Sequence, residues 1–304
     1  MTTDDAFPAI SPKMSQDLFL IRDASWDERF KENFNQFIIS RLETSWRVIK
    51  LPLPPSRTSN HALFFVTSGQ MEVSIGHQTY TVGPQSLVIV PALQIFTIQT
   101  ISADSTGFMC FVSQEMIRSA VDESDFAFLK LTGHPFVTLS AQQTTFINNL
   151  LSRLTVEYLE NGAAKTDLIP PYLLVLLTEI NRAYAGTFPI KTDASDRLVQ
   201  RFMDLLTTQI RQSRLTTTYA EQLNVSPNHL NKVIKFRTGK SPSVWIDERI
   251  VLEAKVLLFQ SDLTVSQVAQ QLGFDDQSSF GKLFRKYAQV SPTEFRNHYV
   301  RPND

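Results

Sequence analysis

Two groups of polar and basic side chains recur about 50 residues apart in the last third of the chain. The first group is Asn228, Asn231 and Lys232, and the second is Gln277, Ser278 and Lys282. An Asn or Gln amide can pair with adenine through two hydrogen bonds, and a lysine can donate to O6 and N7 of guanine. Each group could therefore read the edges of base pairs in a groove.

Three more cations, Lys235, Arg285 and Lys286, follow these groups at about one further helical turn. Such positions suit phosphate oxygens, which fix the register of a protein on nucleic acid. A single Lys or Asn is more often a solvated surface residue, and an ordinary helical bundle also has polar faces. A bundle, however, has no reason to repeat the same polar positions, whereas two readers of successive major grooves do.

The segments that carry these side chains match each other along their length. Residues 220–245, AEQLNVSPNHLNKVIKFRTGKSPSVW, correspond to residues 269–295, AQQLGFDDQSSFGKLFRKYAQVSPTEF, with one residue inserted in the turn. Each segment is typical of a short helix, a tight turn and a second helix whose inner face is apolar and whose outer face is polar and basic. Ser226, and either Asp275 or Asp276, are suitable starts for the second helices. The sequence therefore predicts two helix-turn-helix units.

A long helix is predicted between the two units, from Ser241 and Pro242 to about Gln260. About 18 residues at about 1.5 Å each give a rod of about 27 Å. Adjacent major grooves on one face of DNA lie about 34 Å apart, so this rod could hold two readers in register.

Residues 196–297 resemble the DNA-binding domain of the AraC/XylS family of transcription regulators. The resemblance rests on the motifs SPNHLNKVIKFRTGKSP, VAQQLGFDDQSSFGKLFRKY and SPTEFR. It implies that the second helix of each unit reads double-stranded DNA in the major groove, and that the chain is a transcription activator with RNA polymerase as a partner. Asn228 and Lys232 differ from the large aromatic or arginine residues that members of the family often carry. Gly281 takes an outward position that could not reach a base.

The front part of the chain has the rhythm of an all-β structure. Short apolar runs recur every 8 to 12 residues from His61 to Val112, and turn formers separate them. Met71, Val73 and Ile75 alternate with polar residues, which places one face of that strand inward. The run VTSGQMEVSIGHQTYTVGPQSLVIVPA resembles the cupin-like sensor domain of the same family, which implies an effector pocket inside a barrel.

Helical spacing replaces this rhythm after residue 113. Two apolar stripes are predicted, Phe146, Leu150, Leu154 and Tyr158 on one helix and Leu173, Leu177, Ile180 and Tyr184 on the next. The stripes either pack on the barrel or seat a second subunit. We predict a homodimer formed by the front domain, because the stripes exceed what one small barrel must cover.

The predicted fold is α+β: an N-terminal cupin-like β-barrel with following helices, then an all-α C-terminal domain of two helix-turn-helix units joined by a long helix. Residues 1–188 would be the cupin-like sensor and dimerisation domain, residues 189–195 a linker, and residues 196–304 the DNA-binding domain. The boundary falls at GTFPIKTDAS, which has Gly, Pro and polar residues without periodicity.

Four apolar strand residues, Phe64, Val73, Ile89 and Phe96, could line the effector pocket, although each is also suited to plain core packing. The main interpretation is a DNA-binding regulator that responds to a small effector. The alternative is a regulator without a small-molecule effector, whose front domain serves only for dimerisation or for contact with another protein.

We expect neither an enzyme nor a bound metal or cofactor. Metal-binding cupins use a closely spaced His-x-His pair with a Glu and a later His. The predicted barrel has His61 and His77 alone, and we expect both in turns or at the surface. The sequence has no convincing catalytic triad and no Gly-rich phosphate loop.

Composition limits the remaining possibilities. Residues 193–304 carry 15 Lys and Arg against 12 Asp and Glu, whereas residues 1–192 carry 14 against 18, so the net charges are +3 and −4. No stretch approaches the roughly 20 apolar residues that span a bilayer. The single Cys110 lies in the apolar run GFMCFV, which indicates a buried thiol and, with the absent membrane segment, a cytoplasmic protein.

Overall fold

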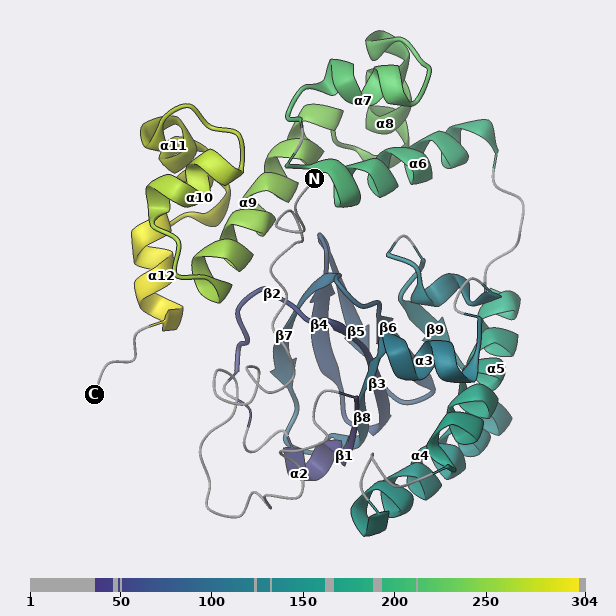
Figure 1. Ribbon diagram of the computed structural model, residues 1–304. Coiled ribbons are helices and arrows are strands. Elements are labelled where there is room, and N and C mark those ends of the chain that lie inside the picture. Colours follow the sequence, from purple (N-terminus) through teal and green to yellow (C-terminus); the bar gives the residue numbers. More distant parts are fainter. Residues whose placement is uncertain are drawn as a thin grey trace. The chain divides into compact units, whose positions relative to one another are not determined.

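The computed structural model describes residues 36–45, 49, 51–122, 125–131, 133–161, 167–187, 193–211 and 213–300. The chain divides into two compact units, residues 1–189 and 190–304, whose elements are labelled in Figure 1. The predicted α+β class is confirmed, since β-sheet in the front unit is followed by helices alone in the described part of the second. The linker is predicted at residues 189–195, and its part 189–192 lies outside the described residues.

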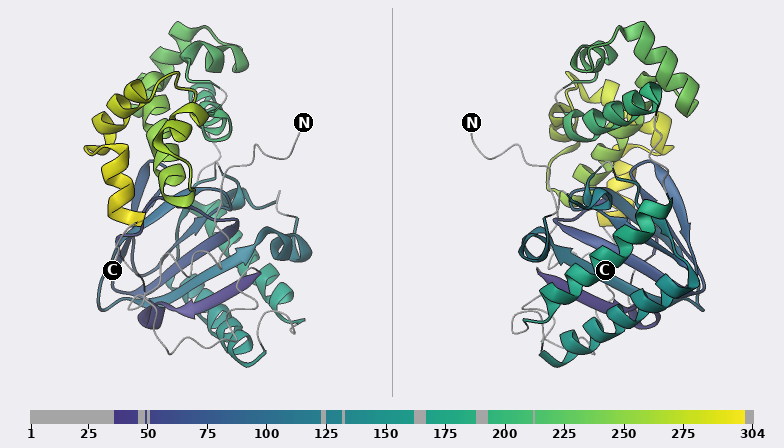
Figure 2. Two further views of the ribbon diagram at one scale, coloured as in Figure 1. Left: turned by 60° about the vertical axis from the view of Figure 1, so that its left-hand side comes forward. Right: turned by 90° about the vertical axis from the view of Figure 1, so that its right-hand side faces the viewer.

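The described strands of the front unit form two antiparallel sheets. The first sheet has the order β1 (Phe37–Arg41), β8 (Thr106–Ser113), β3 (Asn60–Ser68), β6 (Ser86–Val90) and β9 (Phe136–Thr138). The second has the order β2 (Ser56–Arg57), β7 (Ile95–Ile101), β4 (Met71–Ile75) and β5 (Gln78–Val82). The two sheets give the front unit a layered β structure (Figure 2).

Alternation along the strands decides which residues lie between the two sheets. In β4 the predicted alternation is present, because Met71, Val73 and Ile75 are buried and the residues between them are half-exposed. The Phe64 ring of β3 lies 6.2 Å from the Phe96 ring of β7, so these side chains meet across the two sheets. Burying this apolar surface is what stabilises the pair of sheets.

The outer face of the five-stranded sheet is covered by helices. These are α3 (Gln114–Ala120), α4 (Ala141–Asn161) and α5 (Ile169–Thr187), with the short η4 (Ala127–Leu129) beside them. A core of buried residues from β1, β3, β6 and β8 packs against α4 and α5, which run side by side in the right-hand view of Figure 2. Cys110 is part of this core, as predicted for a buried thiol.

The predicted stripe on α4 is partly wrong. Leu154 and Tyr158 are buried as predicted, but Leu150 is only half-buried and the Phe146 side chain is 46% exposed. Ile147 and Leu151 take the buried positions instead, so the apolar face is rotated by about one residue. The remaining short helix of this unit is α2 (Leu42–Ser45).

The second unit consists of two three-helix groups in its described part. The first is α6 (Ala194–Gln209), α7 (Thr216–Gln222) and α8 (Pro227–Thr238), and the second is α9 (Pro242–Gln260), α10 (Val265–Gln271) and α11 (Gln277–Ala288), followed by α12 (Pro292–Val300). Both predicted helix-turn-helix pairs are thus present, as α7–α8 and α10–α11. The predicted joining helix is α9, with 19 residues.

Equivalent positions of the repeat share the same backbone geometry. The turn between the paired helices holds Asn224 at φ 56° and Gly273 at φ 75°. The second helices end on Gly239 at φ 77° and on Gln289 at φ 61°. This left-handed conformation is easy for glycine and costs other residues about 1 to 2 kcal/mol. The repeat therefore keeps the turn geometry even where the sequence does not supply glycine.

The middle of α9 is the core of the second unit. Arg249 and Glu253 are both buried there and form an ion pair at 2.9 Å, while Arg249 also donates to the Thr207 carbonyl of α6 at 3.4 Å. Removing either partner would leave an uncompensated charge in an apolar interior, which is strongly destabilising. In the described part of the chain, no helix is both long enough and apolar enough to cross a bilayer.

Candidate nucleic-acid interface

Helix α8 is held by its inner face and leaves its outer face free. Leu230 and Ile234 are buried, and Ser226 caps the helix by accepting a hydrogen bond from the His229 backbone N–H at 3.2 Å. Pro227 at the first helical position has the φ that a helix start requires. The local sequence therefore fixes both where α8 begins and which side it buries.

Successive residues of a helix are turned by about 100°, so the buried pair defines the opposite, outward direction. Lys232 lies in the middle of this outward face of α8. Asn228, His229, Lys235 and Phe236 surround it, and all are exposed. Asn231 is exposed as well but lies at the edge of the face rather than at its centre.

Helix α11 repeats this arrangement. Phe280 and Phe284 are buried, and Asp276, one of the two predicted start residues, caps the helix by accepting from the Ser279 backbone N–H at 2.8 Å. The predicted readers and phosphate contacts of this unit are all exposed: Gln277, Ser278, Lys282, Arg285 and Lys286. Lys282 lies at the centre of the outward face with Ser278 one turn before it, whereas Gln277 is the first residue of α11 and, seven residues before Phe284, lies on the side of the buried phenylalanines.

The two outward faces differ in charge. Helix α8 has no acidic residue, whereas Asp276 and its neighbour Asp275 stand exposed at the start of α11. The pKa of Asp276 is held below its usual value by hydrogen bonds from the Ser279 backbone and hydroxyl. This carboxylate is therefore charged at neutral pH and already engaged in capping.

Polar contacts attach each of these helices to the helix that begins its group. Tyr287 of α11 donates to Asp247 Oδ2 of α9 at 3.1 Å, and burial together with Asp247 raises the pKa of this tyrosine to about 12, so it stays a donor. At the equivalent repeat position, Arg237 of α8 pairs with Asp193 and Asp196 at the start of α6. Both outer helices are thus fixed in orientation.

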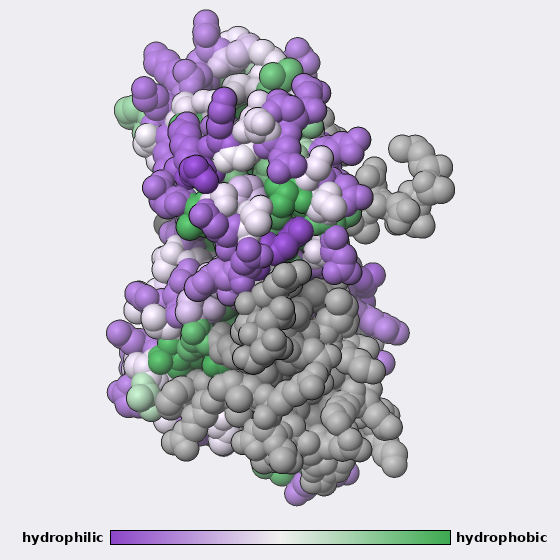
Figure 3. All heavy atoms as spheres, turned by 90° about the vertical axis from the view of Figure 1, so that its left-hand side faces the viewer, coloured by the Kyte–Doolittle hydropathy of each residue, from purple (hydrophilic) through white to green (hydrophobic). Residues whose placement is uncertain are grey.

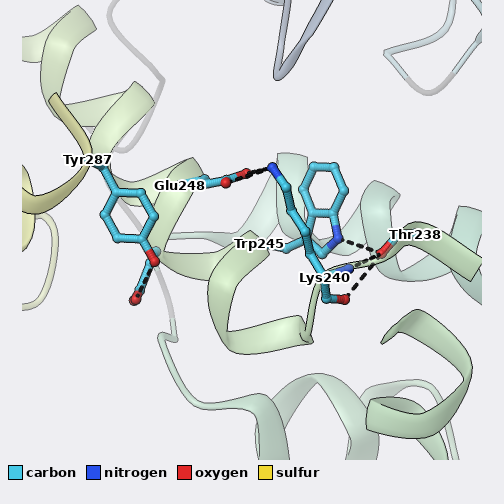
Figure 4. Close-up of polar contacts among 6 residues, drawn as sticks. Thr238, Lys240, Trp245, Glu248 and Tyr287 are labelled. Carbon is cyan, nitrogen blue, oxygen red and sulfur yellow. Dashed lines mark hydrogen bonds and ion pairs between the residues drawn. The ribbon is translucent and has the colours of Figure 1, made fainter. Parts of the chain in front are cut away.

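A second set of contacts links α8 to α9, as drawn in Figure 4. The Trp245 indole Nε1 donates to Thr238 Oγ1 at 2.9 Å. Lys240 Nζ contacts both carboxylate oxygens of Glu248, at 2.7 and 2.9 Å, and lies 5.0 Å from the Trp245 ring centre. These bonds tie the end of α8 to the first turns of α9.

The surface around these helices is mostly hydrophilic. On the face drawn in Figure 3, hydrophilic side chains predominate over the described helices of the second unit, with small apolar areas between them. Sequence reasoning missed His229 and Phe236 on the outward face of α8. Their spacing from Lys232, three residues before and four after, is the signal that places them there.

The structure separates the four residues predicted to line an effector pocket. All are buried. Phe64, Val73 and Phe96 face the space between the two sheets, since Phe64 meets Phe96 and the β4 pairing puts Val73 on the same face as Phe96. Ile89 pairs with Leu63 and belongs to the core under the helices, on the opposite face of its sheet. Ile89 therefore cannot line the same pocket as the other three.

The two histidines of the strand region differ. His77 is exposed in a turn, as expected. His61 is not a surface residue: it is 4% exposed in β3, and its Nδ1 accepts a hydrogen bond from the Ala92 backbone N–H at 3.2 Å. Burial lowers the pKa of His61 to about 4, with a further lowering by Arg118. Among the described residues, no three His, Cys, Asp or Glu side chains lie where they could hold one metal ion.

Comparison with known proteins places the C-terminal repeat in a family. Residues 219–298 match the helix-turn-helix domain family. The chain is 25% identical over 160 residues to the lactose operon transcription activator of Staphylococcus xylosus, which covers 52% of this chain and 57% of that protein. It is 32% identical over 77 residues to the arabinose operon regulatory protein of Escherichia coli K12, and this match covers 25% of this chain and 26% of that protein. The chain thus matches less than two thirds of either relative.

Two solved structures are also similar to parts of the chain. The C-terminal domain of AraT, a response regulator from Geobacillus stearothermophilus, is 29% identical with a TM-score of 0.34, covering 37% of this chain and 92% of that one. ToxT from Vibrio cholerae O395 is 16% identical with a TM-score of 0.47, covering 87% of this chain and 98% of that one.

Proposed function

The chain belongs to the AraC/XylS family of transcription regulators, and we propose that it activates transcription by binding double-stranded DNA through α8 and α11. This family is one of regulators rather than enzymes, in agreement with the expectation from the sequence. The observation that carries the proposal is the pair of exposed outward faces, each centred on a lysine and each fixed on its neighbouring helices. Two such faces suit two successive major grooves.

Each side chain has a role in this proposal. Asn228, Asn231, Lys232, Gln277, Ser278 and Lys282 contact base edges, and Lys235, Arg285 and Lys286 contact phosphates. Gly281 deprives α11 of a side chain where α8 has Asn231, so α8 carries more of the base discrimination. RNA polymerase is the expected protein partner, and a DNA-binding regulator of this kind acts in the cytoplasm.

Alanine substitutions in the full chain test these roles. Replacing Asn231 or Gln277 by Ala should cost about 1 to 3 kcal/mol of binding free energy on a preferred duplex and relax the preference at one or two base pairs. Replacing Lys235 or Lys286 by Ala should weaken binding equally for all sequences and reduce the slope of log affinity against log salt by about one unit each.

The control is the exposed Val290 in the loop after α11, which should tolerate Ala without a change in binding. Binding is measured on duplexes selected from a random library, at several fixed salt concentrations. Unchanged affinity and sequence preference after Asn231→Ala and after a further substitution, Lys232→Ala, would show that α8 is not a recognition helix.

The front unit has two candidate roles. The first is binding of a small effector between the sheets, where Phe64, Val73 and Phe96 lie. A thermal-shift screen against metabolites tests this role, because a ligand that binds the folded state stabilises it. The second is dimerisation or protein contact without an effector. The exposed apolar residues of α4 and α5 favour this second role: Phe146, Val156, Leu159, Leu174 and Val175.

A further inference from the structure

Phe236 is the most exposed large apolar side chain among the described residues. It is 83% exposed, against 65% for Leu215, the next in order. It lies on α8, one turn beyond Lys232 on the outward face. A large aromatic group that leaves nearly all its surface in water gives up the stabilisation that burial would provide. Such a side chain is expected to bury its ring against a partner.

The surroundings of Phe236 identify the chemistry of that partner. Helix α8 carries Lys232 and Lys235 near the ring and has no acidic residue, while its third cation, Arg237, is already paired with Asp193 and Asp196. Exposed polar groups at Asn228 and His229 share the same face. An apolar protein surface would have to desolvate these cations to reach the ring, which is unfavourable. A polyanion gains from the same cations, so the charge pattern favours nucleic acid over a protein surface.

The internal repeat adds an independent comparison. Phe236 occupies the position that Lys286 occupies in α11, since Leu230 and Phe280 are equivalent. Lys286 can contact a phosphate, but a phenyl ring has neither a charge nor a hydrogen-bond donor for that purpose. The apolar group that the edge of a base pair offers in the major groove is the C5-methyl of thymine.

We propose that Phe236 is a specificity-determining residue that contacts the C5-methyl group of one thymine in the site read by α8. The inference rests on the proposed binding of DNA through α8 and adds a contact that hydrogen-bonding residues cannot make. The first unit would then select thymine at one position by apolar contact. The second unit would use Lys286 at the equivalent position for affinity without sequence preference.

The test removes the methyl group and the ring separately. The full chain first selects a preferred duplex from a random-sequence library, and each thymine of that duplex is then replaced singly by deoxyuridine. The wild-type chain should lose about fourfold in affinity at one thymine, which is the effect of losing one buried methyl group. The Phe236→Ala chain should bind the unmodified duplex more weakly and should be insensitive to deoxyuridine at that position.

Two further variants sharpen the result. Phe236→Lys copies the second unit and should abolish the sensitivity to deoxyuridine while increasing the salt slope by about one unit. Leu215→Ala truncates another exposed apolar residue of the same unit and should keep the wild-type sensitivity. Because Phe236 is so exposed, its substitution does not threaten folding of the unit.

The outcomes separate the inference from the proposed function. Binding of DNA with no deoxyuridine effect at any thymine overturns the contact but leaves DNA recognition through α8 intact. An effect that persists unchanged in Phe236→Ala also overturns it, because another residue must then contact the methyl group. Loss of transcription activation in Phe236→Ala without any change in DNA affinity would assign Phe236 to a protein partner instead. A chain that selects no sequence from the library overturns both proposals.

Discussion

At the scale of single residues, the face of the helix or strand that a side chain occupies decides what it can contact. In α8 the contrast between apolar and polar positions is clear, because Leu230 and Ile234 alternate with exposed polar residues. In β6 it is absent, because all five residues of SLVIV are buried. Periodicity therefore could not tell which side of β6 Ile89 faces, and the structure places it away from the predicted pocket.

His61 shows a second limit at the residue scale. A histidine at the start of an apolar run has no pattern that separates a turn from a buried strand position. The fold buries it in β3, where the Ala92 backbone N–H donates to its Nδ1. The neutral imidazole that accepts this bond is also the form that burial favours.

This burial predicts a pH dependence of stability. The pKa of His61 falls from 6.5 to about 4 in the folded chain, so the unfolded chain takes up the proton first as the pH drops. Stability from this group is complete above about pH 6.5 and is lost between that value and about pH 4. The full loss is roughly 3 kcal/mol. Chemical denaturation of the full chain at several pH values measures it.

The control for this pH dependence is His61→Asn, whose amide oxygen can accept the same hydrogen bond without titrating. The difference in unfolding free energy between wild type and variant should shrink or reverse as the pH falls from 6.5 to 4. A difference that stays constant over this range would contradict the prediction, because it would mean that His61 binds its proton equally in the folded and unfolded chain.

At the scale of elements, the repeat made most of the second unit predictable. Two weak helix-turn-helix patterns support each other because the same residue types recur at the same positions, down to the caps Ser226 and Asp276. What the sequence did not predict is how the outer helices are oriented. That depends on the contacts of Tyr287 with Asp247 and of Trp245 with Thr238, which join residues of different helices and leave no periodic signal.

The cap of α8 gives a prediction at this scale. Ser226→Ala removes the hydroxyl that accepts a hydrogen bond from the His229 backbone N–H, so this N–H in the first turn of α8 loses its partner. The change should cost about 1 kcal/mol of stability. Because α8 also carries the proposed contacts to DNA, binding of a selected duplex should weaken through fraying of its first turn. Unfolding and binding are measured on the same preparations.

The matched control is Thr264→Ala, which removes the cap of α10, where Thr264 accepts from the Gln267 backbone N–H at 3.2 Å. This helix carries none of the proposed DNA contacts. The two variants should therefore lose similar stability, while only Ser226→Ala loses affinity beyond what its unfolded fraction explains. Equal losses of DNA affinity in both would attribute the effect to stability alone.

The whole chain combines an acidic front part with a basic C-terminal part, and the front part carries an apolar surface that its own core does not use. Of the nine large apolar side chains exposed in the described residues, six lie on α4 and α5 or directly before α5, so exposure is concentrated rather than scattered. Such a concentration is typical of an interaction surface. A second copy is the simplest occupant, because a two-fold axis lets one surface bind itself.

This surface predicts a dimer that a single charge should dissociate. Val175 of α5 is 47% exposed, and Val175→Asp would bury a carboxylate in the interface, which is strongly unfavourable. The wild-type chain should sediment as a dimer at micromolar concentration and the variant as a monomer. Val290→Asp, at a valine 39% exposed outside this surface, is the control and should remain dimeric.

The DNA-binding consequence follows from the same dimer. A dimer has four reading helices, so it should bind a duplex with two sites more tightly than a duplex with one, because the second binding event is intramolecular. Val175→Asp should lose this advantage and keep the single-site affinity, since α8 and α11 are untouched. Should the wild-type chain sediment as a monomer, or should Val175→Asp keep the two-site advantage, α4 and α5 do not form the interface.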